Sequence, residues 1–185
     1  MIEANAFEAL LREMEATADD FWNVGRDNAA FLALLAKSSG ARRVLEVGTS
    51  NGYSTLWLAR ALVETGGGEV VAIEYDAARS ALARRNYQRA GLDNVITLLE
   101  GDGRTLIAEQ TGSFDFVFLD AEKTQYADYL RAVLPLVRGG GLIIGDDTIS
   151  LRAQMGEYIE LVFSSPELES VEVPIDDGII ISYKK

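Results

Sequence analysis

Residues 44–54 of the chain have the sequence VLEVGTSNGYS, which predicts a buried strand, a glycine-rich turn and the start of a helix. Gly48 and Gly52 frame a loop in which the backbone can approach a ligand closely, and the helix N–H groups would face an anionic group there. The dinucleotide fingerprint G-x-G-x-x-G needs glycine two residues after Gly48, but Ser50 stands there. The pattern is instead E-x-G-x-x-x-G from Glu46, and Gly48, Ser50 and Gly52 are candidate ligand-binding residues.

The composition limits the kinds of protein that the chain can form. With 185 residues and 48% hydrophobic composition, we expect one globular domain, residues 1–185, with a substantial core. No window has the apolar length of a membrane span, and the acidic, alanine-rich N-terminus is unlike a secretory signal, so we expect a cytoplasmic protein without a membrane partner. The net charge of −12 argues against nucleic acid as a partner and is compatible with a cationic ligand.

The chain contains neither histidine nor cysteine, and both absences restrict its chemistry. Disulfides, thiolate metal sites, imidazole zinc sites and catalysis by histidine are excluded. A bound metal would need oxygen ligands, which favours Mg²⁺, with Mn²⁺ or Ca²⁺ as alternatives. A general base would have to be a carboxylate, a lysine or a tyrosine.

Predicted strands and helices alternate along the chain. We expect strands at residues 43–47, 69–74, 95–99, 114–119, 142–145, 168–173 and 178–184. Helices are expected at 3–20, 27–38, 53–64, 76–90, 104–110, 123–137 and 151–163, so that 1–38 forms a helical segment covering the site. The last two strands flank a hairpin signal, Asp176-Asp177-Gly178. This order predicts an α/β fold, a Rossmann-like doubly wound sheet of seven strands, mostly parallel with an antiparallel C-terminal hairpin strand.

Acidic residues and glycines stand at successive strand ends, where ligands collect in open α/β sheets. Glu74 ends one strand, and its carboxylate could accept hydrogen bonds from both hydroxyls of a ribose, or could stabilise the next helix N-terminus. Asp102, between Gly101 and Gly103, could accept a hydrogen bond from an adenine amine, or could cap the following helix.

Three further acids follow the next two strands. Asp120 ends one strand, and Asp146 and Asp147 end its expected neighbour, so the three carboxylates should form a cluster. Such a cluster repels itself unless a positive charge is present, and Mg²⁺ would satisfy it. Alternatively, Asp146 or Asp147 caps the following helix while Asp120 only contacts a cofactor. Lys123 by itself would be read as solvated surface.

Taken together, these motifs resemble class I S-adenosylmethionine-dependent methyltransferases, and among them the cation-dependent O-methyltransferases that include the caffeoyl-CoA and catechol enzymes. The resemblance runs from about Asn23 to the C-terminus and is most specific in residues 44–54 and 114–147. Glu46 could act electrostatically near the sulfonium or amino group of the methyl donor, or could only order the loop. The resemblance implies S-adenosylmethionine as the donor, in contact with Val24, Gly48, Ser54 (at the donor's carboxylate), Glu74 and Asp102.

The segment from Asp120 to Lys123 resembles the family's D-A-[DE]-K segment, which implies Asp120 as a metal ligand and Lys123 as the catalytic base. Asp146 and Asp147 would supply two more oxygen ligands. Asp147 departs from the family's Asn and adds a negative charge that could tighten metal binding or change which metal binds. Glu122 replaces the aromatic residue of the catechol enzymes, which places the chain closer to the caffeoyl-CoA branch.

The resemblance therefore predicts a Mg²⁺-assisted O-methyltransferase that acts on a small aromatic vicinal diol, such as a catechol. The alternatives are a metal-independent methyltransferase of another small-molecule acceptor and a non-catalytic donor-binding module. The glycine spacing disfavours a nicotinamide oxidoreductase. An N-terminal apolar stripe could cover the acceptor pocket, form a homodimer, or pack on the chain's own core; it consists of Phe7, Leu10, Leu11, Phe21 and Trp22.

Overall fold

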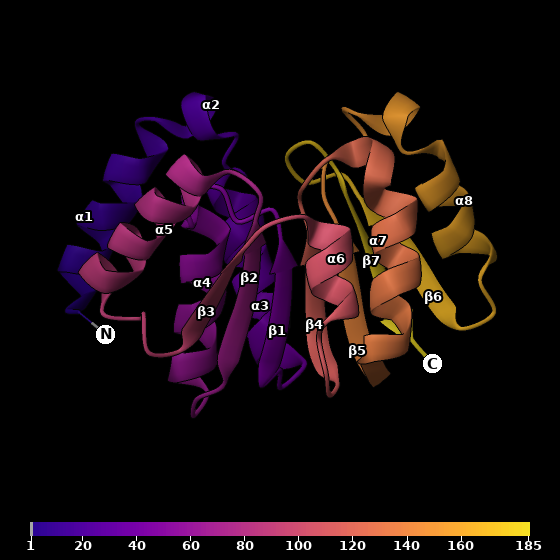
Figure 1. Ribbon diagram of the computed structural model, residues 1–185, viewed down its shortest axis with the longest axis horizontal. Helices are drawn as coiled ribbons and strands as arrows, with labels where there is room; N and C mark the ends of the chain where they lie inside the picture. Colours follow the sequence, from indigo (N-terminus) through magenta and orange to yellow (C-terminus); the bar gives the residue numbers. More distant parts are fainter. Residues whose placement is uncertain (1) are drawn as a thin grey trace.

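The computed structural model describes residues 2–185 and is built around a seven-stranded sheet (Figure 1). The strand order is β3-β2-β1-β4-β5-β7-β6. The neighbouring strands from β3 to β5 are parallel, whereas β7 is antiparallel to both β5 and β6. The predicted fold class is confirmed. The strands are β1 Arg43–Val47, β2 Glu69–Glu74, β3 Ile96–Glu100, β4 Phe114–Leu119, β5 Val137–Gly145, β6 Leu168–Val173 and β7 Ile179–Lys184.

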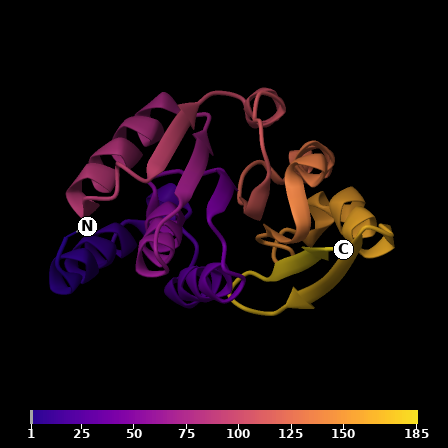
Figure 2. The ribbon, with the colours of Figure 1, turned by 90° about the horizontal axis from the view of Figure 1, so that it is seen from below.

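Helices cover both faces of this sheet (Figure 2). One layer contains α1 Ala4–Glu15, α3 Arg26–Ser38, α4 Tyr53–Glu64 and α5 Ala77–Ala90. The other contains α6 Gly103–Ala108, α7 Tyr126–Val133 and α8 Gly156–Ser164. Because successive side chains of a strand point to opposite faces, Phe116 packs with the first layer and Val117 with the second. This two-sided burial explains why β4 is an almost continuous apolar run.

Three of the predicted helices are divided in the structure, and the one expected at 151–163 consists of the 3₁₀ turn Arg152–Gln154 followed by α8. The helix expected at 3–20 consists of α1 and a short α2, Ala18–Phe21. The helix expected at 123–137 consists of α7 between the 3₁₀ turns Lys123–Gln125 and Leu134–Leu136, because Pro135 lacks the N–H that would continue α7. The following strand begins at Val137, earlier than predicted, and its pairing with β4 shifts register between Phe114 and Phe116.

The N-terminal apolar stripe divides between two environments. Phe7, Leu10 and Leu11 are buried in the core beneath α1, so for them packing on the chain's own core is the correct interpretation. Trp22, by contrast, is 76% exposed. Within residues 2–185, no helix combines the length and apolar character needed to cross a membrane.

The strand ends that matter for function lie level with one another. Val47 pairs with Leu119, and Leu119 pairs with Gly145, so β1, β4 and β5 end at the same edge of the sheet. The helix after β1 covers one face and the helix after β4 covers the other. The chain therefore leaves β1 and β4 toward opposite faces of the sheet, and a crevice opens at the carboxyl ends of these two strands.

Candidate active site

A cavity of about 1160 Å³ lies at this edge of the sheet. The N-terminal segment contributes one wall, which includes Phe21 and Trp22. Three of the predicted site residues, Glu46, Gly52 and Ser54, do not line the cavity. The predicted site residues that do line it are Val24, Gly48, Ser50, Glu74, Gly101, Asp102, Gly103, Asp120, Lys123, Asp146 and Asp147.

Gly48 brings the end of β1 against the end of β4. Its φ is +93°, and a Cβ at this position would lie 1.9 Å from the backbone oxygen of Asp120. Only glycine combines this conformation with such a close approach. The loop after β1 can therefore lie flat against the floor of the cavity and expose its backbone to a ligand.

Glu74 is held by backbone donors on both of its carboxylate oxygens. Ser50 N donates to Oε2 at 2.7 Å, and Asp76 N donates to Oε1 at 2.9 Å. The cap of α5 is Asp76, which accepts hydrogen bonds from the N–H groups of Ala78 and Arg79. Capping is thus assigned to another residue, and the fixed Glu74 carboxylate keeps lone pairs that can accept hydrogen bonds from a diol in the cavity.

Asp102 combines a structural role with a place in the cavity wall. Its Oδ2 accepts hydrogen bonds from Thr105 N and Thr105 Oγ1, both at 3.0 Å, so it caps α6. The hydrogen bond from the Thr105 N–H, followed by that from its hydroxyl, lowers the pKa of Asp102. The cap interpretation is therefore correct for one oxygen, and the residue still faces the cavity.

Glu46 lies beneath α4, where it is completely buried. It accepts hydrogen bonds from the hydroxyls of Ser54 and Thr55. Burial raises the pKa of Glu46 to about 7, although these hydroxyls oppose the shift. Gly52 faces Tyr87, whose ring would lie 2.5 Å from a Cβ at that position. The geometry of Glu46, Ser54 and Gly52 fits a role in ordering the loop.

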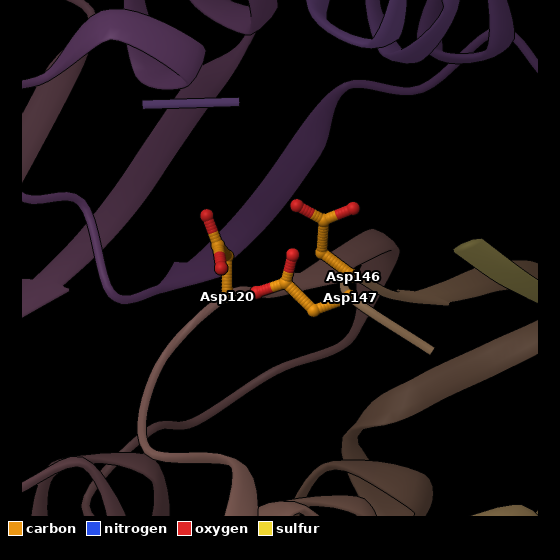
Figure 3. A group of neighbouring side chains, drawn as sticks. All are labelled: Asp120, Asp146 and Asp147. Atoms are coloured by element: carbon orange, nitrogen blue, oxygen red, sulfur yellow. The ribbon is translucent and has the colours of Figure 1, made fainter. Parts of the chain in front are cut away.

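Three carboxylates converge at the ends of β4 and β5 (Figure 3). One oxygen each from Asp120, Asp146 and Asp147 lies within 4.8 Å of the others, and Asp147 points toward Asp120 in Figure 3. The Nζ of Lys123 lies between two of them, at 2.7 Å from Asp120 Oδ1 and 2.7 Å from Asp147 Oδ2. The strand ends thus assemble the predicted acidic cluster together with Lys123.

The electrostatics of this cluster follow from its burial. Burial raises the pKa of Asp146 well above its ordinary value, and the neighbouring charges of Asp120 and Asp147 raise it further. Burial also raises the pKa of Asp120, against the attraction of Lys123. Burial alone would lower the pKa of Lys123, but Asp120 and Asp147 outweigh that effect and raise it. With Asp120 and Asp147 as its neighbours, Lys123 is therefore a buried ammonium.

The donor set fits a divalent cation. Lys123 engages one oxygen of Asp120 and one of Asp147, and Asn28 donates to Asp146 Oδ1, which leaves a second oxygen on each carboxylate. Clustered carboxylate oxygens are the hard ligands that Mg²⁺, Mn²⁺ and Ca²⁺ prefer. The three aspartates could hold such an ion, which would also relieve their mutual repulsion.

Sequence motifs do not identify Arg79, the turn at Asp176 and Asp177, or Asn28 as parts of the site. Arg79 places its guanidinium carbon 4.6 Å from the ring centroid of Trp22, so a stacked pair stands in the wall. Asp176 and Asp177 give only a hairpin signal in the sequence, but the turn folds back on the loop after β5 and borders the cavity. No local signal marked Asn28, whose contact with Asp146 joins residues 118 positions apart.

Known proteins resemble this chain in both sequence and structure. A family model described as O-methyltransferase matches residues 3–185. A catechol O-methyltransferase of Niastella koreensis is 39% identical over 131 residues, which cover 69% of this chain and 58% of that protein. A caffeoyl-CoA O-methyltransferase of Medicago sativa is 30% identical over 201 residues, which cover 94% of this chain and 81% of that protein. The matched part thus spans little more than half of the catechol enzyme's length.

A solved O-methyltransferase from Bacillus cereus, in complex with SAH, superimposes with a TM-score of 0.86 and 29% identity, covering 100% of this chain and 93% of that one. The fold and the cavity at the strand ends define a ligand-binding α/β protein of the doubly wound type. The chain belongs to the O-methyltransferase family, and the resemblance inferred from its motifs is confirmed.

Proposed function

We propose that the protein transfers a methyl group from S-adenosylmethionine to a hydroxyl of a small aromatic vicinal diol, assisted by a divalent cation. One observation carries this proposal: a single cavity joins a donor half to an acid half. The similarity to catechol and caffeoyl-CoA O-methyltransferases supports the acceptor class. The donor half is Gly48, Ser50, Glu74 and Asp102, and the acid half is Asp120, Lys123, Asp146 and Asp147.

The donor half would orient the methyl donor. Glu74 would accept hydrogen bonds from the ribose hydroxyls, because both of its oxygens are already fixed by backbone N–H groups. Gly48 would allow the donor to lie against the loop, and Val24 would cover it from the N-terminal segment. Alignment of a bound nucleophile with the reacting carbon can contribute roughly 7–11 kcal/mol to catalysis.

The acid half would orient and deprotonate the acceptor. A phenolic hydroxyl with a pKa near 10 costs roughly 4 kcal/mol to ionise at neutral pH. When bound, a divalent cation would hold adjacent acceptor oxygens and lower that cost. Lys123 would take the proton at Nζ. Once the charges of Asp120 and Asp147 are neutralised, the burial of Lys123 lowers its pKa and makes it a competent base.

We further propose that residues 1–185 act as one methyltransferase domain, with 1–38 as the segment that covers the site. Support comes from the cavity wall, since Phe21, Trp22 and Val24 all belong to that segment. Residues of both chain halves border the same cavity, from Ala18 to Asp177.

A second candidate, a metal-independent methyltransferase, is favoured by one specific observation. The ammonium of Lys123 already bridges Asp120 and Asp147, so the cluster has a counter-charge of its own. In that case the aspartates would hold Lys123 in place, and activity would not depend on a cation.

The test is a turnover assay with S-adenosylmethionine and a panel of catechols, in which S-adenosylhomocysteine and the methylated product are identified by mass spectrometry. We expect product in the presence of Mg²⁺, loss of turnover with a chelator, and recovery when excess Mg²⁺ is added. Turnover that withstands the chelator would favour the second candidate. Donor binding without any methylated catechol would contradict the first candidate.

A further inference from the structure

A buried asparagine joins the N-terminal segment to the acid half. Asn28 lies in the first turn of α3 and has no exposed surface. Its Nδ2 donates a hydrogen bond to Asp146 Oδ1 at 2.9 Å. This contact connects a helix near the start of the chain to a carboxylate that follows β5, on a residue that is itself 4% exposed.

The other end of the same amide is unsatisfied. Within residues 2–185, Asn28 Oδ1 has no hydrogen-bond partner. A buried unpaired polar atom costs about 1–3 kcal/mol, so stability alone does not explain an asparagine at this position. Turning the amide would bring Oδ1 against an oxygen of Asp146, and an ionised carboxylate has no hydrogen to donate, so with the metal-binding form of Asp146 only the observed orientation gives a hydrogen bond. The Asn28 amide therefore donates to Asp146 while its own oxygen stays without a hydrogen bond among the described residues.

The start of α3 is attached to the cavity at a second point. Gly25 N donates to Asp176 Oδ2 at 2.6 Å, and Asp176 belongs to the turn between β6 and β7. Val24, immediately before this turn of helix, lines the cavity. Asn28 thus links Asp146 to the start of α3, and Val24 of the cavity wall lies directly before this helix.

We propose that Asn28 is a positioning residue for the cation that the acid half would hold: its amide N–H fixes the orientation of the Asp146 carboxylate, which would be a ligand of that ion. Partners that orient metal ligands typically contribute 10–100-fold to metal affinity. Because such coupling is reciprocal, cation binding in turn stabilises the first turn of α3. This inference rests on the cation of the proposed function and does not depend on the identity of the acceptor.

The first experiment measures Mn²⁺ affinity from the electron paramagnetic resonance signal of free Mn²⁺. Asn28→Leu keeps the approximate volume of the side chain and removes the donor. Asn86→Leu is the matched control, because Asn86 is 3% exposed and donates through Nδ2 to Asn51 O at 3.0 Å, away from the acid half. We expect a 10–100-fold loss of Mn²⁺ affinity in Asn28→Leu and a change within about twofold in Asn86→Leu. Equal affinities in the two variants would overturn the proposal.

The second experiment uses the wild-type protein and remains decisive if Asn28→Leu fails to fold. Hydrogen exchange of the amides in residues 25–30 is measured with and without saturating Mn²⁺. We expect slower exchange with the ion, and unchanged exchange would overturn the coupling. If Mn²⁺ affinity depends on Asn28 but no catechol is methylated, the proposed function fails and the role of Asn28 stands. If the wild-type protein binds no Mn²⁺, the role of Asn28 fails as well.

Discussion

The donor half and the acid half of the cavity both depend on carboxylates that have hydrogen-bond partners within the protein, but the kind of partner differs. In the donor half, backbone N–H groups hold Glu74 and Asp102, from the loop after β1 and from the starts of α5 and α6. In the acid half, side chains hold the carboxylates: Lys123 contacts Asp120 and Asp147. The first arrangement is fixed by the fold, whereas the second can exchange one positive partner for another.

Because of this difference, the donor half is already arranged to bind a ligand, whereas the acid half needs a positive charge to balance its carboxylates. A fixed carboxylate at Glu74 can receive a ligand without rearrangement, which favours affinity. The raised pKa values of Asp120 and Asp146 show that the acid half is unfavourable when fully ionised. Donor binding should therefore be independent of a cation, and turnover should not be.

The largest expected effect concerns the acid half. Asp146→Ala should lower kcat/KM for a catechol about 10³-fold, since the cation's contribution of several kcal/mol is lost. The affinity for S-adenosylhomocysteine, measured by calorimetry, should stay within a few-fold because no donor-half residue changes. Asp177→Asn is the control, since Asp177 borders the cavity outside the carboxylate cluster. Full activity in Asp146→Ala would contradict the claim that turnover, unlike donor binding, depends on a cation in the acid half.

The next effect concerns the buried acid beneath the donor half. The pKa of Glu46 is raised from 4.5 to about 7 by burial, so the folded state favours its protonated form. Its contribution to stability is complete below pH 4.5 and is lost as the pH rises through 7. Relative to Glu46→Gln, the wild-type protein should lose at most about 3 kcal/mol of unfolding free energy over this range. Urea unfolding at several pH values measures it, and parallel pH profiles of the two proteins would contradict it.

A smaller effect is expected at the ribose position. Glu74→Gln should weaken binding of S-adenosylhomocysteine about 10- to 100-fold, because charge-assisted hydrogen bonds contribute roughly 1.5–3 kcal/mol. Asp76→Asn is the control, since Asp76 caps α5 and does not line the cavity. It should lower stability and leave affinity nearly unchanged. Wild-type affinity in Glu74→Gln would show that the fixed carboxylate does not contact the donor.

The smallest effect concerns acceptor charge. Asp176 and Asp177 add to the negative charge of the acid half, and Arg79 and Arg104 are the only other cations among the described cavity residues besides Lys123. A catechol with an amine should therefore exceed a catechol with a carboxylate about tenfold in kcat/KM at low salt. The ratio should fall at high salt, where surface charges are screened. An inverted ratio would show that the acceptor avoids this acidic rim.

The sequence was sufficient to predict the sheet and the acidic cluster. Apolar runs bounded by glycines marked the strands, and the level carboxyl ends of parallel strands brought Asp120 and Asp146 together. The alternation of side chains along β1 also explains why Glu46 does not line the cavity. Glu46 shares the face of Val44, so it points beneath α4, whereas Val47 points to the cavity side.

Other features could not be read from local patterns. Asn28 carries no sequence signal, because its partner is set by the packing of α3 against the end of β5. Lys123 resembled a surface residue in isolation, and only the fold shows that it is buried between two aspartates. The hairpin turn at Asp176 was predicted as a turn, but its place at the cavity depends on how β7 pairs with β5.

The most direct test of the contrast between the halves is a calorimetric titration of Mg²⁺ into protein saturated with S-adenosylhomocysteine, with Asp146→Ala in parallel. The account predicts saturable Mg²⁺ binding in the wild-type protein and none in the variant, while both proteins bind S-adenosylhomocysteine. An acid half that binds neither Mg²⁺ nor Mn²⁺, even with a catechol present, would contradict it.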